Sequence, residues 1–237
     1  MKTKFSLCLY TAIAVTAAMA ATSCKNGNDE TGYYGTYHAV MPAADCPGIS
    51  TTVILDSNGV YTIEREYLER FSAYRETGKY TENEGKLTLI SNDNDTSYLK
   101  IADGAMQWLD RQGNEITGDL ADSYMLKRVL PLILPDKMEK EKAKITGNWV
   151  EPVPGMPGQF QGISLQSEGK AESINMATLQ YESWDRIGHV IFLNGKSIGN
   201  GMTIEFTDTL LIKSCTKDSL ILASKDGMEI RYAKETL

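Results

Sequence analysis

The sequence predicts an all-β protein, made of two small antiparallel β-barrels in tandem after an export signal. Short segments of alternating apolar and polar residues, separated by Gly, Asn and Asp, recur about every 8 to 12 residues, which is the spacing of antiparallel barrels and sandwiches. The pattern stops at a polar segment in mid-chain and then starts again. The chain has 237 residues, 42% hydrophobic and 23% charged, so its composition is that of an ordinary globular protein.

Residues 1–23 have the pattern of a signal peptide. Lys2 and Lys4 give a basic start, residues 5–21 are uncharged and apolar, and small residues precede Cys24. The sequence AATSC at 20–24 resembles the lipobox of bacterial lipoproteins, which implies cleavage before Cys24 and acyl chains on that cysteine. Two or more such chains anchor a protein stably in a membrane. The alternative is a plain secretory signal cleaved near Ala20.

The processed chain is acidic. Loss of the two lysines in residues 1–23 takes the formal net charge from −7 to −9. This balance, without any basic cluster, argues against nucleic acid as a partner. Residues 24–32 are polar and contain glycine, so they are expected to form a flexible tether.

The first barrel is predicted over residues 33–128. Its strands are expected at 51–56, 59–66, 85–91, 96–102 and 123–129, with a hairpin turn at 56–59. Pro131 and Pro135 then interrupt an apolar run, and a mixture of Lys and Glu follows. We therefore expect a solvated linker over 129–144.

The second barrel is predicted over residues 145–237. Alternating segments lie at 160–166, 169–175, 188–194, 202–208, 209–214, 218–224 and 228–235. Pairs such as Ile163 and Leu165, or Leu220 and Leu222, face one side of their strands. These pairs predict a second, separate core.

Both predicted barrels open with a Gly-x-aromatic sequence, Tyr37 in the first and Trp149 in the second. This opening, followed about 90 residues later by a basic final strand, resembles lipocalins and their calycin relatives. The resemblance implies calycin/lipocalin-like barrels in which a cation from the last strand lies across the aromatic ring. The candidates are Lys127 or Arg128 over Tyr37, and Arg231 over Trp149, in a contact of about 0.5 to 2 kcal/mol.

The first unit also resembles the N-terminal domain of NlpE, a family of Gram-negative outer-membrane lipoproteins. Four blocks occur in the same order: the Gly-x-Tyr opening, a Pro-x-x-Asp-Cys-x-Gly-Ile loop, a mid-domain Gly-x-Tyr, and Leu-Asp-x-x-Gly-x-x-Ile before the last strand. The resemblance implies an outer-membrane location, a link to copper homeostasis or an envelope stress response, and an envelope signalling partner. The second unit instead resembles the lipocalin-like domains of Bacteroidetes lipoproteins.

Cys46, in the loop MPAADCPGIS at 41–50, has two interpretations. NlpE proteins commonly carry Pro-Cys-x-x-Cys here, and Ala43 replaces the first cysteine, so a local dithiol switch is excluded. Cys46 is then either a structural loop thiol or a copper ligand with Met41 and His38, since copper favours sulfur and imidazole ligands. Whether Cys46 pairs with Cys215 is left open.

The sequence predicts a binding or sensing protein without enzymatic activity. It contains no nucleophile elbow and no metalloprotease motif, and apart from copper no cofactor is expected. A second interpretation is a carrier of a small apolar or glycan-derived ligand in the second barrel, with Met156 and Phe160 on a flap at 151–162. A third is a structural surface accessory.

Overall fold

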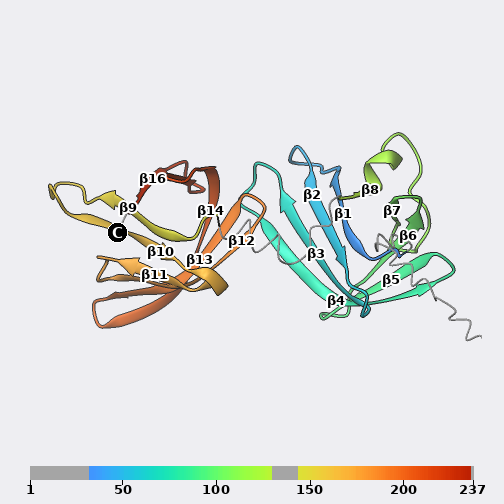
Figure 1. Cartoon of the computed structure of the whole chain (residues 1–237), viewed down its shortest axis with the longest axis horizontal. Helices are drawn as coiled ribbons and strands as arrows, with labels where there is room; N and C mark the ends of the chain where they lie inside the picture. Colours follow the sequence, from blue (N-terminus) through green and yellow to red (C-terminus); the bar gives the residue numbers. More distant parts are fainter. Residues whose placement is uncertain (1–31, 130–143, 236–237) are drawn as a thin grey trace, which may run out of the picture. The chain divides into compact units, whose positions relative to one another are not determined.

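The computed structural model describes residues 32–129 and 144–235, and it confirms the prediction of an all-β protein with two antiparallel barrels (Figure 1). Within those ranges each barrel has eight strands. The predicted signal peptide, the anchor Cys24 and most of the tether and linker lie outside the described residues.

The first barrel is a closed ring of sequential strands. They are β1 (Gly35–Met41), β2 (Ile49–Leu55), β3 (Val60–Tyr67), β4 (Ala73–Asn83), β5 (Lys86–Ser91), β6 (Thr96–Ala102), β7 (Ala105–Trp108) and β8 (Met125–Arg128), with a short 3-10 helix at Ala121–Tyr124. The ring closes where β1 pairs with β8, through Tyr37 opposite Arg128 and His38 opposite Lys127. Closure leaves the sheet without a free edge.

Alternation along each strand builds the core of the first barrel. In β2, Thr51, Val53 and Leu55 are buried, while the residues between them are half-buried at the outer face. The predicted turn at 56–59 joins β2 to β3, where the Asp56 amide donates to the Val60 carbonyl at 2.9 Å and Gly59 has a φ of 78°. A left-handed residue at this place favours glycine.

The second barrel contains another eight antiparallel strands. They are β9 (Gly147–Pro152), β10 (Phe160–Leu165), β11 (Ala171–Ile174), β12 (Leu179–Ile187), β13 (Val190–Gly199), β14 (Met202–Cys215), β15 (Ser219–Ala223) and β16 (Glu229–Lys234). Its core includes Trp149, Ile163, Leu193 and Leu220, each at most 1% exposed.

This second barrel is nearly closed. The paired order runs β11-β10-β9-β16-β15-β14-β13-β12, so the remaining seam lies between β11 and β12. Contacts across the seam include a bridge between Lys170 and Ser183, a hydrogen bond of 2.8 Å from the Tyr181 amide to the Ser173 hydroxyl, and one of 2.8 Å from the Trp184 indole N–H to the Gln166 carbonyl.

Five observed strands were absent from the predicted strand ranges: β1 and β9, which the sequence marked only as the openings of the two units, and β4, β7 and β12. The sequence of β4, AYRETGKYTEN, is mostly polar and shows no clear alternation of apolar and polar residues, which is why it was missed. Only Gly78 and Tyr80 in it are buried. A β-bulge between Tyr181 and Ser183 breaks the alternation of β12. In addition, the two segments predicted at 202–208 and 209–214 form the single long strand β14.

Candidate functional site

An aromatic ring under a cation closes one end of the first barrel. Tyr37 is 2% exposed, and the Arg128 guanidinium lies 5.7 Å from the centre of its ring. The Tyr37 hydroxyl donates a hydrogen bond of 2.9 Å to the Tyr33 carbonyl. Burial raises the pKa of Tyr37, and the positive charge of Arg128 partly offsets that rise. Of the two predicted cations, Arg128 therefore lies over this ring.

The second barrel has the same kind of closed end, which we call the floor: Trp149, Ile145 and Lys234. Trp149 is fully buried and its indole N–H donates to the Ile145 carbonyl at 2.7 Å. The Lys234 ammonium lies 5.0 Å from the ring centre and donates to the Thr146 carbonyl at 3.0 Å. The floor is thus fixed by one aromatic ring, one cation and two backbone carbonyls.

The prediction that Arg231 covers Trp149 is wrong, and Lys234 takes that place. Alternation along β16 turns Tyr232 and Lys234 to the inner face, so Arg231 points outward and pairs with Glu229 at 2.5 Å. Gly147 explains the Gly-x-aromatic motif, because its φ is 137° and a Cβ there would lie 2.5 Å from Lys234 Cε. The glycine leaves room for the lysine to cross the indole.

The other half of the first barrel's interior is filled by a neutral polar cluster. The Arg65 guanidinium lies 5.4 Å from the Tyr74 ring centre and 5.1 Å from that of Trp108. It pairs with the Glu76 carboxylate at 3.0 Å, and the Tyr61 hydroxyl donates to the same carboxylate at 2.7 Å. Burial and this hydrogen bond raise the pKa of Tyr61. The charges here compensate one another, so the cluster stabilises the barrel and presents no unpaired charge.

The three candidate copper ligands do not come together. Met41 is buried on the inner face of β1, and His38, an odd number of residues away, faces outward and lies 3.1 Å from the Ser50 hydroxyl. The Cys46 thiol donates to the Gly48 carbonyl at 3.3 Å. Within the described ranges, no group of three or more His, Cys, Asp or Glu side chains has the arrangement of a metal site. This geometry favours the loop-thiol interpretation of Cys46.

Cys46 and Cys215 are both free thiols. Cys215, at the end of β14, is half-buried, and burial raises the pKa of its thiol. Neighbouring positive charges, with Arg186 the largest, offset part of that rise. A thiol with a raised pKa is a poor nucleophile at neutral pH.

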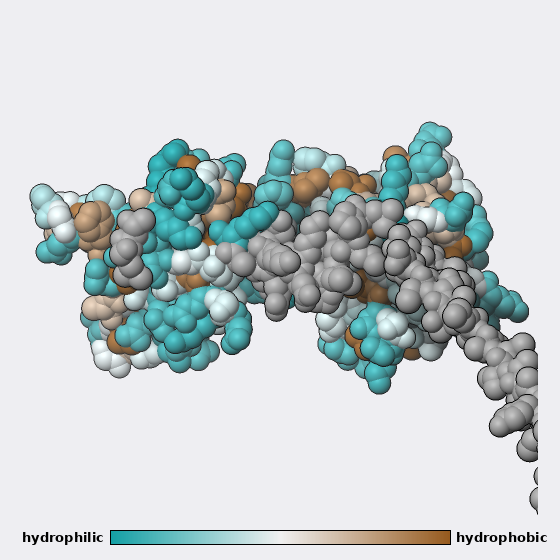
Figure 2. All heavy atoms as spheres, viewed as in Figure 1, coloured by the Kyte–Doolittle hydropathy of each residue, from teal (hydrophilic) through white to brown (hydrophobic). Residues whose placement is uncertain are grey.

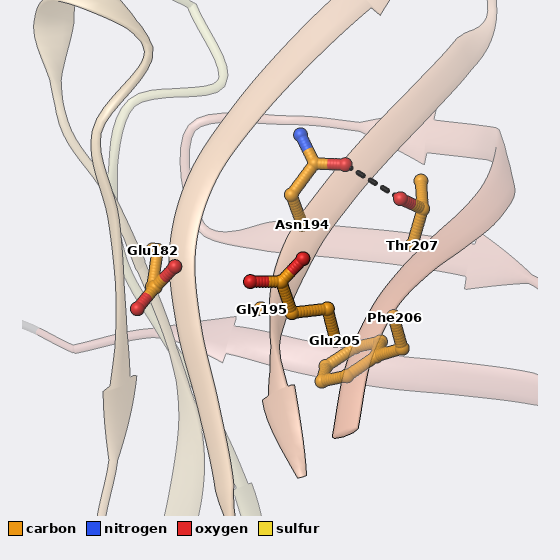
Figure 3. Close-up of a pocket in the computed structure, with 6 residues that line it drawn as sticks. All are labelled: Glu182, Asn194, Gly195, Glu205, Phe206 and Thr207. Atoms are coloured by element: carbon orange, nitrogen blue, oxygen red, sulfur yellow. Dashed lines mark hydrogen bonds between the residues drawn. The ribbon is translucent and has the colours of Figure 1, made fainter. Parts of the chain in front are cut away.

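A pocket of about 460 Å³ lies on strands β12, β13 and β14 (Figure 3). It is lined by Glu182, Asn194, Gly195, Glu205, Phe206 and Thr207. Asn194 accepts from the Thr207 hydroxyl at 2.7 Å and donates to the Ser183 hydroxyl at 3.1 Å, while Glu182 pairs with Lys196 at 2.6 Å. Its volume suits a small ligand, but Glu182, Asn194 and Thr207 already have partners within the protein.

Met156 and Phe160, the two predicted ligand contacts, are exposed at the β9–β10 hairpin. The face of the molecule in Figure 2 is mostly hydrophilic, with scattered hydrophobic patches. The hairpin ends at 198–204 and 224–228 lie at the same end of the barrel, opposite the floor, because the strands are antiparallel. They add Ile198, Met202, Ile204 and Met228, which sequence reasoning missed. We call these six exposed side chains the rim.

Among the described residues, no helix has the length and apolar character needed to cross a membrane.

Comparison with known proteins finds a different family match for each barrel. Residues 37–119 match the NlpE N-terminal domain and residues 141–235 match the lipocalin-like family. Lipoprotein NlpE of Escherichia coli strain K12 is 32% identical over 83 residues, a match that spans 34% of this chain and 35% of the relative. The chain therefore covers about a third of that protein's length.

Two solved structures have higher coverage of their own length. A lipocalin-like protein from Bacteroides thetaiotaomicron is 61% identical, over 39% of this chain and 97% of that chain, with a TM-score of 0.37. A putative lipoprotein from Shewanella oneidensis is 33% identical, over 40% of this chain and 88% of that chain, also with a TM-score of 0.37. Residues 37–119 are thus similar to NlpE N-terminal domains, and residues 141–235 are similar to lipocalin-like domains.

Proposed function

We propose that this protein is a lipid-anchored binding or sensing protein of the cell envelope, with no catalytic activity. The observation that carries the proposal is the NlpE N-terminal match at 37–119, directly after a tether and a lipobox at Cys24. The acyl chains on Cys24 hold the protein in the outer membrane. Residues 33–128 form the NlpE-type sensing domain, and residues 145–237 form a lipocalin-like domain that adds a separate function.

The sensing domain acts through its outer surface and loops. Its interior supports this view, because the half near Tyr37 is packed with apolar side chains and the other half contains the charge-compensated Arg65–Glu76 pair. A filled and electrically neutral interior leaves recognition to the exterior. The partner is an envelope signalling protein, and the linked process is copper homeostasis or the envelope stress response. Since Cys46, Met41 and His38 lie apart, copper acts through this response without a local three-residue site.

The test is overproduction of the full chain and of a Cys24→Ala variant in a Gram-negative host, followed by membrane fractionation, intact-mass measurement and sequencing of messenger RNA. Wild type is expected in the outer membrane, with acyl groups, and with raised transcripts for envelope-stress and copper-export genes. Cys24→Ala is expected as a soluble or unprocessed chain. Cys8→Ala, which changes a cysteine of the removed segment, is the matched control and should behave as wild type.

Two results would contradict the proposal separately. Unchanged membrane partitioning and mass in Cys24→Ala would remove the lipid anchor. Unchanged transcripts on overproduction of the wild-type chain would remove the sensing function.

The second candidate function is a carrier of a small ligand in the lipocalin-like barrel. The observation that favours it is the rim, since exposed apolar side chains gathered at one end of a domain indicate a binding surface. Binding of an apolar probe at the rim tests it.

A further inference from the structure

The rim is a concentrated apolar surface. Within residues 144–235, all the large apolar side chains that are 38 to 60% exposed belong to it. Half of them are methionines, whose flexible thioether chains adapt to ligands of different shapes. At the same end, the Asn175 side chain in the β11–β12 connection donates a hydrogen bond of 2.9 Å to the Phe160 carbonyl, which fixes the start of β10. The rim therefore gathers apolar side chains from three hairpins at one end of the barrel.

A carboxylate and a tyrosine hydroxyl lie just inside the rim. Glu151 is two residues from Trp149 on β9, so it faces inward, and Gln161 donates to its carboxylate at 3.2 Å. The pairing of Ala233 with Val150 sets Tyr232 next to Glu151 on the inner face. Tyr232 is 8% exposed, yet its hydroxyl makes no hydrogen bond within the described residues. The hydroxyl is not among the fully buried atoms that lack a partner, so it keeps contact with solvent and is available to a ligand.

A second carboxylate completes the group. Asp208 pairs with the inward-facing Leu193 and accepts a hydrogen bond of 2.9 Å from the Tyr181 hydroxyl. Burial raises the pKa of Tyr232, and the negative charges of Glu151 and then Asp208 raise it further. Both carboxylates therefore act electrostatically on the Tyr232 hydroxyl.

The charge inside this end of the barrel is uncompensated. Neither Glu151 nor Asp208 has an ion pair within the described part of the chain. Lys234, the inward cation of β16, is held at the floor over Trp149. Partly buried carboxylates without a counter-charge are costly, so a bound cation would be stabilised there.

We propose that the rim end of the second barrel binds an organic cation with an apolar body, such as a long-chain amine or quaternary ammonium compound. The cationic head contacts Glu151, Asp208 and Tyr232, and the apolar body covers the rim. The proposal rests on the carrier function given above as the second candidate, and it names the chemical class of the ligand.

The experiment is calorimetric titration of the chain that begins at residue 24, with Cys24→Ser so that no acyl group competes for the rim. The probes are dodecyltrimethylammonium, dodecyl maltoside and dodecanoate, which share a chain length and differ in charge, each below its critical micelle concentration. The cation is expected to bind at least about tenfold more tightly than the neutral probe, which corresponds to one favourable charge interaction. The anion is expected to bind most weakly.

Three variants locate the site. Glu151→Gln is expected to weaken cation binding about tenfold and leave the neutral probe unchanged. Glu172→Gln is the matched control, because Glu172 lies on the outer face of β11 in an ion pair with Lys170, and it should bind as wild type. Tyr232→Phe removes a hydroxyl that has no internal hydrogen bond, so it should weaken cation binding without lowering the melting temperature.

The outcomes distinguish failure of the cation assignment from failure of the carrier function. Equal affinity for the three probes, or equal losses in Glu151→Gln and Glu172→Gln, would overturn the cation assignment and leave the carrier function standing. Failure of every probe to bind would overturn both.

Discussion

Replacing Gly162 by alanine tests whether close backbone contact between β9 and β10 fixes the floor of the second barrel. A Cβ at Gly162 would lie 1.9 Å from the Trp149 carbonyl oxygen and 2.9 Å from its carbonyl carbon. These are backbone atoms, which no rotamer change moves away, so β9 must shift and take Trp149 with it. Overpacking costs about 1 to 3 kcal/mol, and we expect the upper end of that range. A loss of this size lowers the melting temperature of a small domain by roughly 10 °C or more.

Gly199 provides the matched control in the same barrel. A Cβ there would have no neighbouring atom within 4 Å, and its backbone is not in the left-handed region. Gly199→Ala should therefore be neutral, or stabilise by about 0.4 to 1 kcal/mol through the unfolded state. Urea unfolding followed by tryptophan emission measures both variants, and hydrogen exchange should show loosening over 147–165 in Gly162→Ala alone. Equal stability of the two variants, or greater loss in Gly199→Ala, would refute the steric argument.

Two further predictions concern the cation of the floor and the loop thiol. Lys234→Met should lower the free energy of unfolding by about 1 to 3 kcal/mol, because it removes a charged hydrogen bond and the cation over Trp149. The control Arg231→Met, on the outer face, should change the free energy of unfolding by less than about 0.5 kcal/mol. Similar losses of stability in thermal unfolding of the two variants would argue against Lys234 as the floor cation. Copper titration of wild type and Cys46→Ala should give equal, weak binding, since the other two candidate ligands lie on opposite faces of β1; tight binding in wild type alone would restore the metal-site interpretation.

The sequence predicted the aromatic ring at the closed end of each barrel, but it did not predict which cation lies over the ring in the second barrel. Alternation and the Gly-x-aromatic openings indicated Tyr37 and Trp149, because burial of a large ring after a glycine leaves a clear local pattern. The residue pattern of the last strand, EIRYAK, does not decide by itself which face of the strand points inward. Its register on β9, with Lys234 opposite Trp149, decides the matter, and register depends on contacts distant in the sequence.

The rim and the carboxylates behind it show the same limit. Met156, Met202 and Met228 are scattered along the chain, and only the antiparallel order of the strands brings their hairpins to one end. In the sequence, Glu151 is a single charged residue before a proline. Its inward direction follows from its spacing of two residues from the buried Trp149 on the same strand. The bulge in β12 hid that strand altogether, because it interrupts the period of two that identifies strands.

The seam between β11 and β12 makes the second barrel mechanically unequal around its circumference. Every other neighbouring pair of strands is joined by a ladder of backbone hydrogen bonds, whereas one bridge and the side chains of Ser173 and Trp184 connect the two sides here. Local opening is cheapest where the fewest backbone hydrogen bonds must break. Amide protons along this line should therefore exchange with solvent before those of the rest of the wall, and a side chain of the core would reach water there first.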